Sequence, residues 1–297
     1  MKLVLGTVQF GLQYGISNTH GIPTDSELSA IFETAQTNGI TTLDTALAYG
    51  NSEERLGQWN KGRFKIITKF PKVNTEAELK QMFQQSLNNL NSTFVEGYMA
   101  HNADNLIEKP FLWSVLQTLK QEKKNQKIGY SLYTVEQLNT LLDLGCVPDI
   151  VQLPYSLLDR KFETSIKQLH ALGTEIHIRS VFLQGLYWMN PNQLPQKLMP
   201  LQTTLQDLQK ICEQYQVDKG ALALNFVHQN PNVDAVVIGV ENQEQLVQNI
   251  RMIKDWKSND ELMDKIQQIK ITDDSIRFYD RIIFRRNNKL KTITKFL

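Results

Sequence analysis

The sequence predicts an α/β fold of the (β/α)8 TIM barrel type, and three observations lead to this prediction. Eight short segments of β-type composition alternate with longer segments that carry apolar residues at three- and four-residue spacing. Each β-type segment is followed by a helical one, which is typical of parallel strands joined by crossover helices. No Gly-x-Gly-x-x-Gly motif follows the first strand, so a closed barrel is favoured over an open dinucleotide-binding sheet.

The eight predicted strands are short runs bounded by turn residues. They span Lys2–Gly6, Thr41–Thr45, Phe64–Phe70, Val95–His101, Lys127–Leu132, Asp149–Leu153, Glu175–Val181 and Ala235–Val240. The first helix carries Leu28, Ile31 and Ala35 on one face, and Thr24 with Glu27 fits a capping box at its start. A later helix carries Leu79, Phe83 and Leu87, and others are predicted over Phe111–Lys124, Val135–Leu144, Lys161–Leu172, Leu205–Tyr215, Lys219–Gln229 and Gln243–Ile253.

A single domain of residues 1–297 is expected. The length of 297 residues suits one barrel, and no linker or low-complexity tract divides the chain. The longest irregular stretch, Gln184–Gln202, follows the seventh strand and should cover one face of the barrel. From about Arg277 the chain ends in a basic extension with seven Lys and Arg against one Asp, which suits either a solvated tail or contact with an anionic substrate.

Composition excludes several classes of protein. With 32 basic and 31 acidic residues the net charge is +1, so nothing supports nucleic-acid binding. No signal peptide and no run of 18 apolar residues is present, and we therefore expect a soluble, cytoplasmic protein without a membrane partner. Cys146 and Cys212 are far apart and outside any Cys/His cluster, so neither a disulfide framework nor a metal site is expected.

Ionisable side chains follow three neighbouring predicted strands. Strand two ends at Asp44 and is followed by Tyr49, strand three ends at Lys69, and strand four ends at His101. Reactive groups of such barrels come from the C-terminal ends of strands, so these four should lie side by side. A tyrosine has an ordinary pKa near 10, which an adjacent ammonium lowers, and Asp44 would keep Lys69 charged. The set predicts an acid aimed at an oxygen, which suits hydride transfer to a carbonyl.

These residues lie in motifs that resemble those of the aldo-keto reductases. The motifs are LDTALAYGNSEERLG, ITKF and MAHNAD, followed by IGYSLYT, VQLPYSLLDR, IRSVFLQGL and VVIGVENQEQLVQN. The resemblance runs in order from Lys2 to Ile253. It implies that Asp44, Tyr49, Lys69 and His101 form the family's catalytic tetrad, with Tyr49 as proton donor. It also implies an NAD(P)H-dependent oxidoreductase that reduces an aldehyde or ketone, with sugar-derived carbonyls among the candidate substrates.

The resemblance implies a nicotinamide cofactor across the barrel mouth, with NADPH expected and NADH as the alternative. Ser131 and Gln152 match positions that hold the nicotinamide carboxamide. The remaining candidate cofactor residues are Arg179, Ser180, Gly185, Gly239, Glu241, Gln245 and Asn249. Two of them depart from the family, because Arg179 stands where many members stack a tyrosine, and the Glu241 carboxylate would repel a 2′-phosphate. Leu132 also replaces the usual asparagine after Ser131.

Aromatic residues near the predicted mouth are candidates for the substrate wall. They are Phe10, Tyr187 and Trp188, together with the loop Asn102–Pro110. Two other functions remain open from the sequence. One is a nucleotide-binding redox sensor or partner subunit with little turnover, and the other is a sugar dehydrogenase that works in the oxidative direction.

Overall fold

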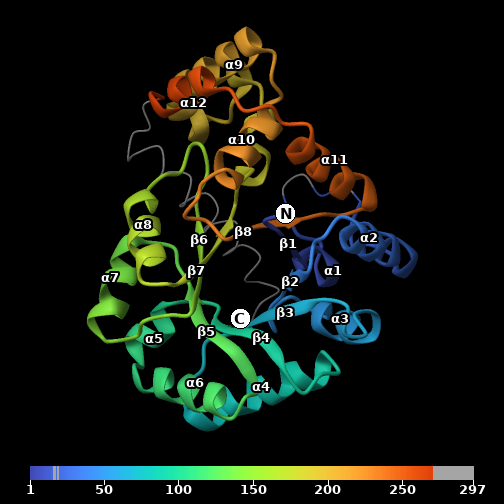
Figure 1. The fold of residues 1–297 in the computed structure, drawn as a ribbon, viewed down its shortest axis with the longest axis vertical. Coiled ribbons are helices and arrows are strands. Elements are labelled where there is room, and N and C mark those ends of the chain that lie inside the picture. The colour runs from blue at the N-terminus through green and yellow to red at the C-terminus, as the bar shows by residue number, and fades with distance from the viewer. Residues whose placement is uncertain (16–17, 19, 270–297) are drawn as a thin grey trace.

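Eight parallel strands close into a barrel in the order of the chain, as the sequence predicts (Figure 1). The structure, a computed structural model, describes residues 1–15, 18 and 20–269. The predicted basic extension from Arg277 therefore lies outside the described residues. The strands are β1 (Leu3–Gly6), β2 (Thr42–Asp44), β3 (Lys65–Phe70), β4 (Val95–Ala100), β5 (Asn125–Ser131), β6 (Ile150–Pro154), β7 (Glu175–Arg179) and β8 (Ala235–Gly239).

Helices surround the barrel and connect each strand to the next (Figure 1). They are α1 (Val8–Gly11), α2 (Asp25–Thr37), α3 (Ser52–Trp59), α4 (Glu76–Asn89), α5 (Asp104–Glu108), α6 (Phe111–Gln121), α7 (Val135–Asp143), α8 (Glu163–Ala171), α9 (Gln202–Tyr215), α10 (Lys219–His228), α11 (Gln243–Lys254) and α12 (Asp260–Gln267). The stretch predicted to be irregular holds three short 3-10 helices, η1 (Leu183–Trp188), η2 (Pro191–Gln193) and η3 (Gln196–Leu201).

The local signals explain where helix α2 begins and ends. The Thr24 side chain accepts a hydrogen bond from the backbone N–H of Glu27, which satisfies one of the free donors of the first turn. Gly39 follows the helix with φ of +74°, a conformation that glycine adopts at little cost. Leu28, Ile31 and Ala35 are fully buried, so the apolar face predicted for this helix packs on the barrel.

The barrel interior is layered. Ile67, Met99 and Ile150 form a small apolar cluster of their own inside the barrel. The next inward-facing residues along β3 and β6 are Lys69 and Gln152, since side chains on one face of a strand recur at every second position. Polar groups therefore lie directly above an apolar plug at the C-terminal ends of the strands, the end where barrels of this type carry their chemistry.

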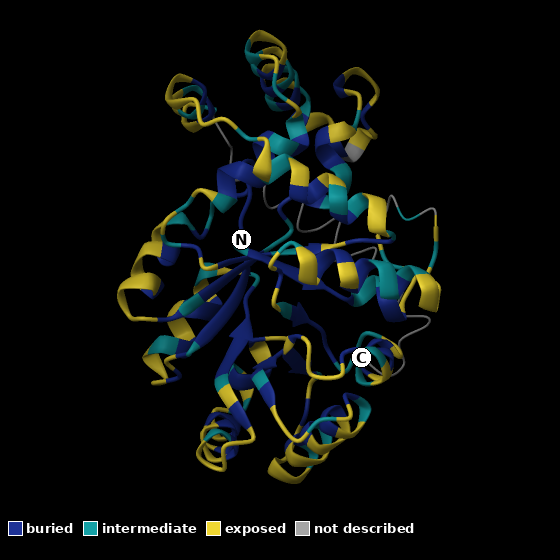
Figure 2. Ribbon diagram, turned by 45° about the vertical axis from the view of Figure 1, so that its right-hand side comes forward, coloured by how far each residue is buried: buried dark blue, intermediate teal, exposed yellow. Residues whose placement is uncertain are grey.

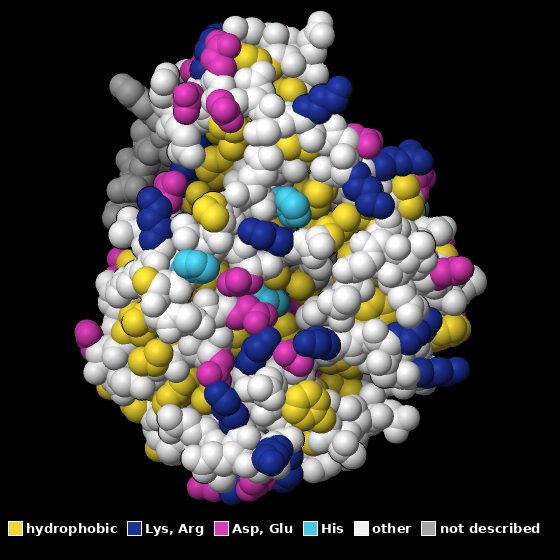
Figure 3. Space-filling view, viewed as in Figure 1, with side chains coloured by type: hydrophobic (Ala, Val, Ile, Leu, Met, Phe, Trp, Pro, Cys, Tyr) yellow, Lys and Arg dark blue, Asp and Glu magenta, His cyan; other side chains and the backbone are white. Residues whose placement is uncertain are grey.

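The outer surface is mixed in character. Figure 2 shows buried strands enclosed by helices whose outer faces are exposed. In the face shown in Figure 3, acidic and basic side chains are interspersed, in keeping with the net charge of +1. Among the described helices, none is both long and apolar enough to cross a membrane.

Candidate active site

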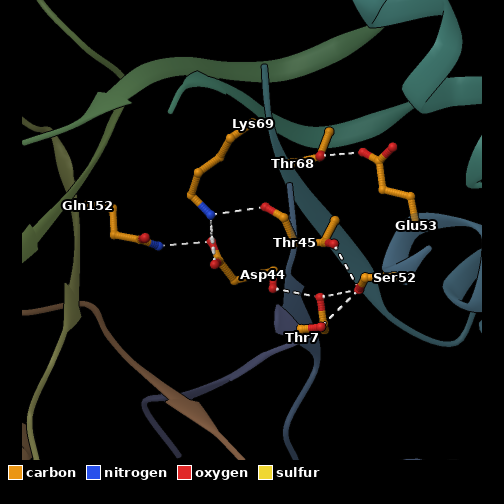
Figure 4. A network of polar contacts seen from close by, with 8 residues as sticks. All are labelled: Thr7, Asp44, Thr45, Ser52, Glu53, Thr68, Lys69 and Gln152. Carbon is orange, nitrogen blue, oxygen red and sulfur yellow. Dashed lines mark hydrogen bonds and ion pairs between the residues drawn. The ribbon is translucent and has the colours of Figure 1, made fainter. Parts of the chain in front are cut away.

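A buried ion pair joins β2 to β3 at the barrel mouth (Figure 4). Lys69 Nζ donates to both carboxylate oxygens of Asp44 at 2.7 Å and to the carbonyl oxygen of Thr45 at 3.0 Å. The side chains of Lys69 and Asp44 are only 0% and 3% exposed. Burial lowers the pKa of Lys69, and the Asp44 carboxylate opposes this by favouring the ammonium.

Tyr49 lies in the loop between β2 and α3, above this pair. Lys69 Nζ is 5.7 Å from the centre of the Tyr49 ring, and the ring meets that of His101 edge-on at 5.5 Å between centroids. Close backbone packing holds the loop, because a Cβ at Gly11 would lie 1.9 Å from the Tyr49 carbonyl oxygen. Gly50 has φ of +59°, and a Cβ there would lie 2.4 Å from the Gly11 carbonyl oxygen. The structure therefore brings Asp44, Tyr49, Lys69 and His101 together.

The electrostatics of Tyr49 differ from the sequence-based expectation that a lysine ammonium lowers its pKa. Burial raises the pKa of Tyr49 well above its ordinary value, and the Asp44 carboxylate raises it further. Arg179 is the cation whose charge opposes this. The expectation of a lowered pKa was wrong for this structure because burial and the Asp44 carboxylate outweigh the effect of the nearby cations. Burial, with the charges of Lys69 and Arg179, lowers the pKa of His101 to about 3, so its imidazole is neutral near pH 7.

Two sets of polar contacts join the first residues of α3 to the strands that carry the ion pair (Figure 4). The Ser52 hydroxyl, at the start of α3, is 2.9 Å from both the carbonyl and the hydroxyl oxygen of Thr7. Thr7 in turn donates to the Asp44 carbonyl at 3.1 Å. The Thr68 hydroxyl donates to the buried Glu53 carboxylate at 2.6 Å, which ties the strand position before Lys69 to the same helix. The helix that follows the Tyr49 loop thus anchors both strands of the ion pair.

Gln152 reaches across the barrel from β6 to the ion pair. Its Nε2 donates to Asp44 Oδ2 at 2.8 Å. Ser131 is its register partner on the neighbouring strand β5. Both residues predicted to hold a carboxamide therefore lie at the mouth, beside the tetrad.

A second polar region surrounds the start of α11. Gly239 ends β8, and a Cβ there would lie 2.5 Å from Gln9 Oε1, an oxygen that is buried and accepts no hydrogen bond from the described residues. The Gln9 amide thus packs directly on the Gly239 backbone, in the space that a side chain there would take, and its buried oxygen is left to accept a hydrogen bond from a bound ligand. Gln245 lies on the first turn, where its Oε1 accepts from the Glu241 N–H at 2.8 Å, and Asn249 is largely buried on the same helix. A nicotinamide dinucleotide fits these residues.

Two carboxylates lie at this helix start. Glu241 is 7% exposed and its Oε2 is 3.2 Å from Nδ1 of His20. Glu27 Oε1 accepts a hydrogen bond from the backbone N–H of Gln243. The sequence pointed to Glu241 alone, because the contact of Glu27 is made between α2 and α11, which lie far apart in the chain.

The segment after β7 has an unusual backbone. Ser180, Leu183 and Gln184 have φ of +64°, +46° and +50°, and Gly185 follows with +89°. Residues other than glycine adopt such angles at a cost, and they persist where the surrounding structure enforces them, often at ligand sites. Ser180 and Gly185, both predicted to contact the cofactor, lie in this strained segment.

Arg179 ends β7 and extends over the end of β5. Its guanidinium lies 4.4 Å from the centre of the Tyr133 ring, and its Nη2 donates to the Leu132 carbonyl at 2.9 Å. The Arg179 charge also lowers the pKa of Tyr14, which burial raises. Neither Tyr14 nor Tyr133 was predicted from the sequence, although Tyr133 lies in the motif IGYSLYT.

The predicted substrate wall is not formed as expected. Phe10 is fully buried and packs edge-on against Phe32 of α2 at 6.0 Å, so its ring belongs to the helix layer. Tyr187 is 1% exposed and also lies in the core. Trp188 is 52% exposed, and its ring lies against Gly220 at the start of α10. The loop Asn102–Pro110 contains helix α5, and its Asn105 side chain bonds both backbone groups of Val73. No described group of three or more His, Cys, Asp or Glu is arranged to hold a metal ion.

Comparison with known proteins agrees with this architecture. A model described as "Aldo/keto reductase family" matches residues 2–271. The chain is 29% identical over 144 residues to the aldo-keto reductase YhdN of Bacillus subtilis, a match that spans 43% of this chain and 43% of that protein. It is 24% identical over 258 residues to the NADH-specific methylglyoxal reductase of Escherichia coli, covering 71% and 78% of the two chains. Aldo-keto reductase AKR11C1 of Bacillus halodurans in its holo form shares the fold, with a TM-score of 0.74, 19% identity and coverage of 92% and 94%.

Proposed function

The chain belongs to the aldo/keto reductase family, whose members are NAD(P)H-dependent oxidoreductases, and on this premise we propose that it reduces an aldehyde or ketone to the alcohol with Tyr49 as general acid. One observation carries the proposal. Asp44, Tyr49, Lys69 and His101 meet above an apolar plug at the barrel mouth, within the contacts described above. Sugar-derived carbonyls remain one candidate group of substrates.

The roles of the four residues follow from their charge states. The neutral imidazole of His101 can donate a hydrogen bond from its ring N–H to the carbonyl oxygen of the substrate. Because it is not protonated, it does not act as a second acid in place of Tyr49. Tyr49 retains its proton in the ground state because burial raises its pKa. Proton transfer leaves a negative charge on the Tyr49 oxygen, and the nearby Lys69 ammonium favours that charge. Asp44 keeps Lys69 charged for this purpose.

We propose that the nicotinamide cofactor, which supplies the hydride when bound, is held by three groups of residues. Ser131 and Gln152 would hold the carboxamide beside the tetrad. Ser180 and Gly185 would contact the phosphates. Gly239, Glu241, Gln245 and Asn249 would hold the adenosine end, next to the orphaned oxygen of Gln9.

The charges at α11 favour NADH over NADPH, whereas the family resemblance alone led us to expect NADPH. The carboxylates of Glu241 and Glu27 both lie at the start of this helix, and neither is paired with a Lys or Arg among the described contacts. A 2′-phosphate would be repelled there, while a ribose hydroxyl can donate a hydrogen bond to a carboxylate. The name of the Escherichia coli relative, an NADH-specific reductase, supports the same choice.

The function is tested with Tyr49→Phe. Turnover of a panel of aldehydes and ketones should fall by about 10²–10⁴, the usual contribution of a positioned general acid, while the dissociation constant of the reduced cofactor stays within a few-fold. Tyr215→Phe is the matched control, because Tyr215 is bonded to Glu261 outside the barrel. Retained turnover in Tyr49→Phe would remove Tyr49 from the acid role. Tight cofactor binding by the wild type without turnover of any carbonyl would support the sensor function instead.

The cofactor choice is tested with the double variant Glu27→Gln/Glu241→Arg. The ratio of the dissociation constants for NADPH and NADH, measured by fluorescence titration, should shift toward NADPH by at least tenfold because a guanidinium binds phosphate well. Glu244→Gln, on the same helix, controls for a general change in charge. An unchanged ratio in the double variant would show that the 2′ position of the cofactor lies elsewhere.

A further inference from the structure

Glu53 is a buried carboxylate on the first turn of α3, and it follows the loop that carries Tyr49. The residue is 1% exposed. Its Oε1 accepts a hydrogen bond from the Thr68 hydroxyl at 2.6 Å, and its Oε2 accepts one from Asn89 Nδ2 of α4 at 3.1 Å. No Lys, Arg or His in the described part of the chain forms an ion pair with Glu53. The carboxylate is therefore held by neutral donors and by its place at a helix start, where the backbone N–H groups favour a negative charge.

A buried carboxylate without a cation is costly, because the protein must replace the water that would otherwise solvate it. Burial raises the pKa of Glu53, and the hydrogen bonds from Thr68 and Asn89 oppose this by favouring the ionised form. An apolar side chain of the same size would pack in this place without that cost. Residues that lower stability in this way are expected at functional sites, so the position of Glu53 beside the tetrad indicates a role in the site.

The contact with Thr68 joins the Tyr49 loop to β3 beside Lys69. Thr68 and Lys69 are neighbours on this strand, and their side chains point to opposite sides of it, with Thr68 turned toward Glu53 (Figure 4). Nearer the start of the loop, the Leu47 N–H donates to the Lys69 carbonyl at 3.0 Å. The segments on either side of Tyr49 are thus bonded to two consecutive residues of β3.

These two attachments fix the acid relative to the ammonium. The Tyr49 N–H donates to the Ala46 carbonyl at 3.0 Å, and the Tyr49 carbonyl accepts from the Ser52 N–H at 3.1 Å, so the ring follows any movement of the loop. Lys69 Nζ lies 5.7 Å from the centre of that ring. A misplacement of about 1 Å at a catalytic site can lower turnover by about 100-fold, so the attachments matter for the rate.

We propose that Glu53 is a positioning residue for carbonyl reduction, and that its bond to Thr68 sets the place of the Tyr49 phenol relative to Lys69. This inference rests on the proposed reductase function and deepens it. Glu53 acts through Thr68 and the loop, and it touches neither the substrate nor the cofactor. A charged acceptor suits this task because its hydrogen bonds are shorter and stronger than those of a neutral one.

The test removes the two partners of this contact singly and together. Thr68→Val leaves the carboxylate with one donor fewer, whereas Glu53→Met/Thr68→Val removes both polar partners. Each variant should lower kcat about tenfold for an aldehyde that the wild type reduces, while KM and the dissociation constant of the reduced cofactor stay close to their wild-type values. The urea midpoint should fall in Thr68→Val and recover in the double variant, because the poorly bonded buried carboxylate is then gone. A structural role alone does not produce low turnover in a variant of recovered stability.

Two further variants separate position from stability. Thr68→Ser keeps the hydroxyl and should retain a kcat close to that of the wild type. Thr174→Val is the matched control, because the buried Thr174 hydroxyl donates to the Pro148 carbonyl at 3.0 Å but precedes β7, at the opposite end of the barrel. This variant should lower the urea midpoint and leave kcat unchanged.

The outcomes separate this inference from the proposed function. Unchanged turnover in Thr68→Val, a loss confined to KM or cofactor affinity, or turnover that recovers with stability in the double variant overturns the inference and leaves the reductase function intact. Absence of turnover by the wild type with any carbonyl overturns the function. Crystal structures of the wild type and the double variant then decide the inference, which stands only if the separation of Lys69 Nζ and the Tyr49 ring centre changes by about 1 Å or more.

Discussion

Replacing Asp44 with asparagine should destabilise the folded protein by about 3–5 kcal/mol, the usual result of removing one partner of a buried ion pair. The remaining ammonium of Lys69 would have no access to water, because this side chain is 0% exposed. Lys69 can avoid the penalty by losing its proton. At pH 7 this costs about 1.4 kcal/mol for each of roughly 3.4 pH units below the ordinary lysine pKa, or about 5 kcal/mol in total. Deprotonation therefore sets the upper end of the range.

Urea unfolding followed by tryptophan fluorescence measures this loss. In Asp44→Asn the pKa of Lys69 is lowered in the folded state, so the unfolded state binds more protons and stability rises with pH. The deficit should therefore shrink between pH 7 and pH 9. Glu76→Gln is the control, because it breaks an exposed pair with Lys80 and should cost at most about 0.5 kcal/mol. A deficit below about 1 kcal/mol, or one that does not change with pH, would refute the dependence of the Lys69 charge on Asp44.

Three further predictions follow from the pKa shifts and the backbone. Because burial and nearby cations lower the pKa of His101 to about 3, the pH–rate profile of carbonyl reduction should show no limb near pH 6.5. A limb near pH 6.5 that is present in the wild type and absent in His101→Gln would contradict a neutral imidazole. Gly50→Ala should displace the Tyr49 loop, since φ is +59° and the new methyl would lie 2.4 Å from the Gly11 carbonyl oxygen. Turnover should fall at least tenfold while cofactor affinity is retained. Unchanged turnover would contradict the role of this packing. Burial tends to raise the pKa of Glu175, but hydrogen bonds from His177 and Lys127 outweigh this and lower the pKa to about 2. The pairing therefore stabilises the fold fully above pH 4.5, and this stabilisation is lost as the pH falls through 2. Glu175→Gln should therefore be less stable than wild type at pH 7, and a urea-unfolding difference that persists unchanged at pH 2 would count against the pairing.

The sequence predicted the barrel and the convergence of Asp44, Lys69 and His101 because both depend on regular spacing. The alternation of β-type and helical segments continues through the whole chain, and all eight predicted strands occur in the barrel. Parallel strands place their C-terminal ends at one edge, so Asp44, Lys69 and His101 had to converge once β2, β3 and β4 were recognised. Tyr49 was grouped with them because its motif resembles that of the aldo-keto reductases.

Residues in loops were predicted less well, because loops have no period that tells which way a side chain points. Phe10 and Tyr187 follow strand ends as Tyr49 does, yet both pack into the core. The contact of Arg179 with Tyr133 joins the last residue of β7 to a residue that follows β5, and β6 lies between these two strands. Nothing in the local sequence of either residue indicates that contact. The second carboxylate at α11, Glu27, was missed for the same reason.

The charge state of the site was the other feature that spacing could not supply. The presence of Asp44, Lys69 and Tyr49 in one place suggested that the lysine acts directly on the tyrosine pKa. The structure instead balances Lys69 against Asp44 at 2.7 Å, and burial then keeps Tyr49 protonated. Arg179 is left as the unbalanced cation of the mouth. Its charge and that of the Lys69 ammonium favour the negative charge that proton transfer leaves on the Tyr49 oxygen, so the site holds the acid protonated before the reaction and stabilises its conjugate base afterwards.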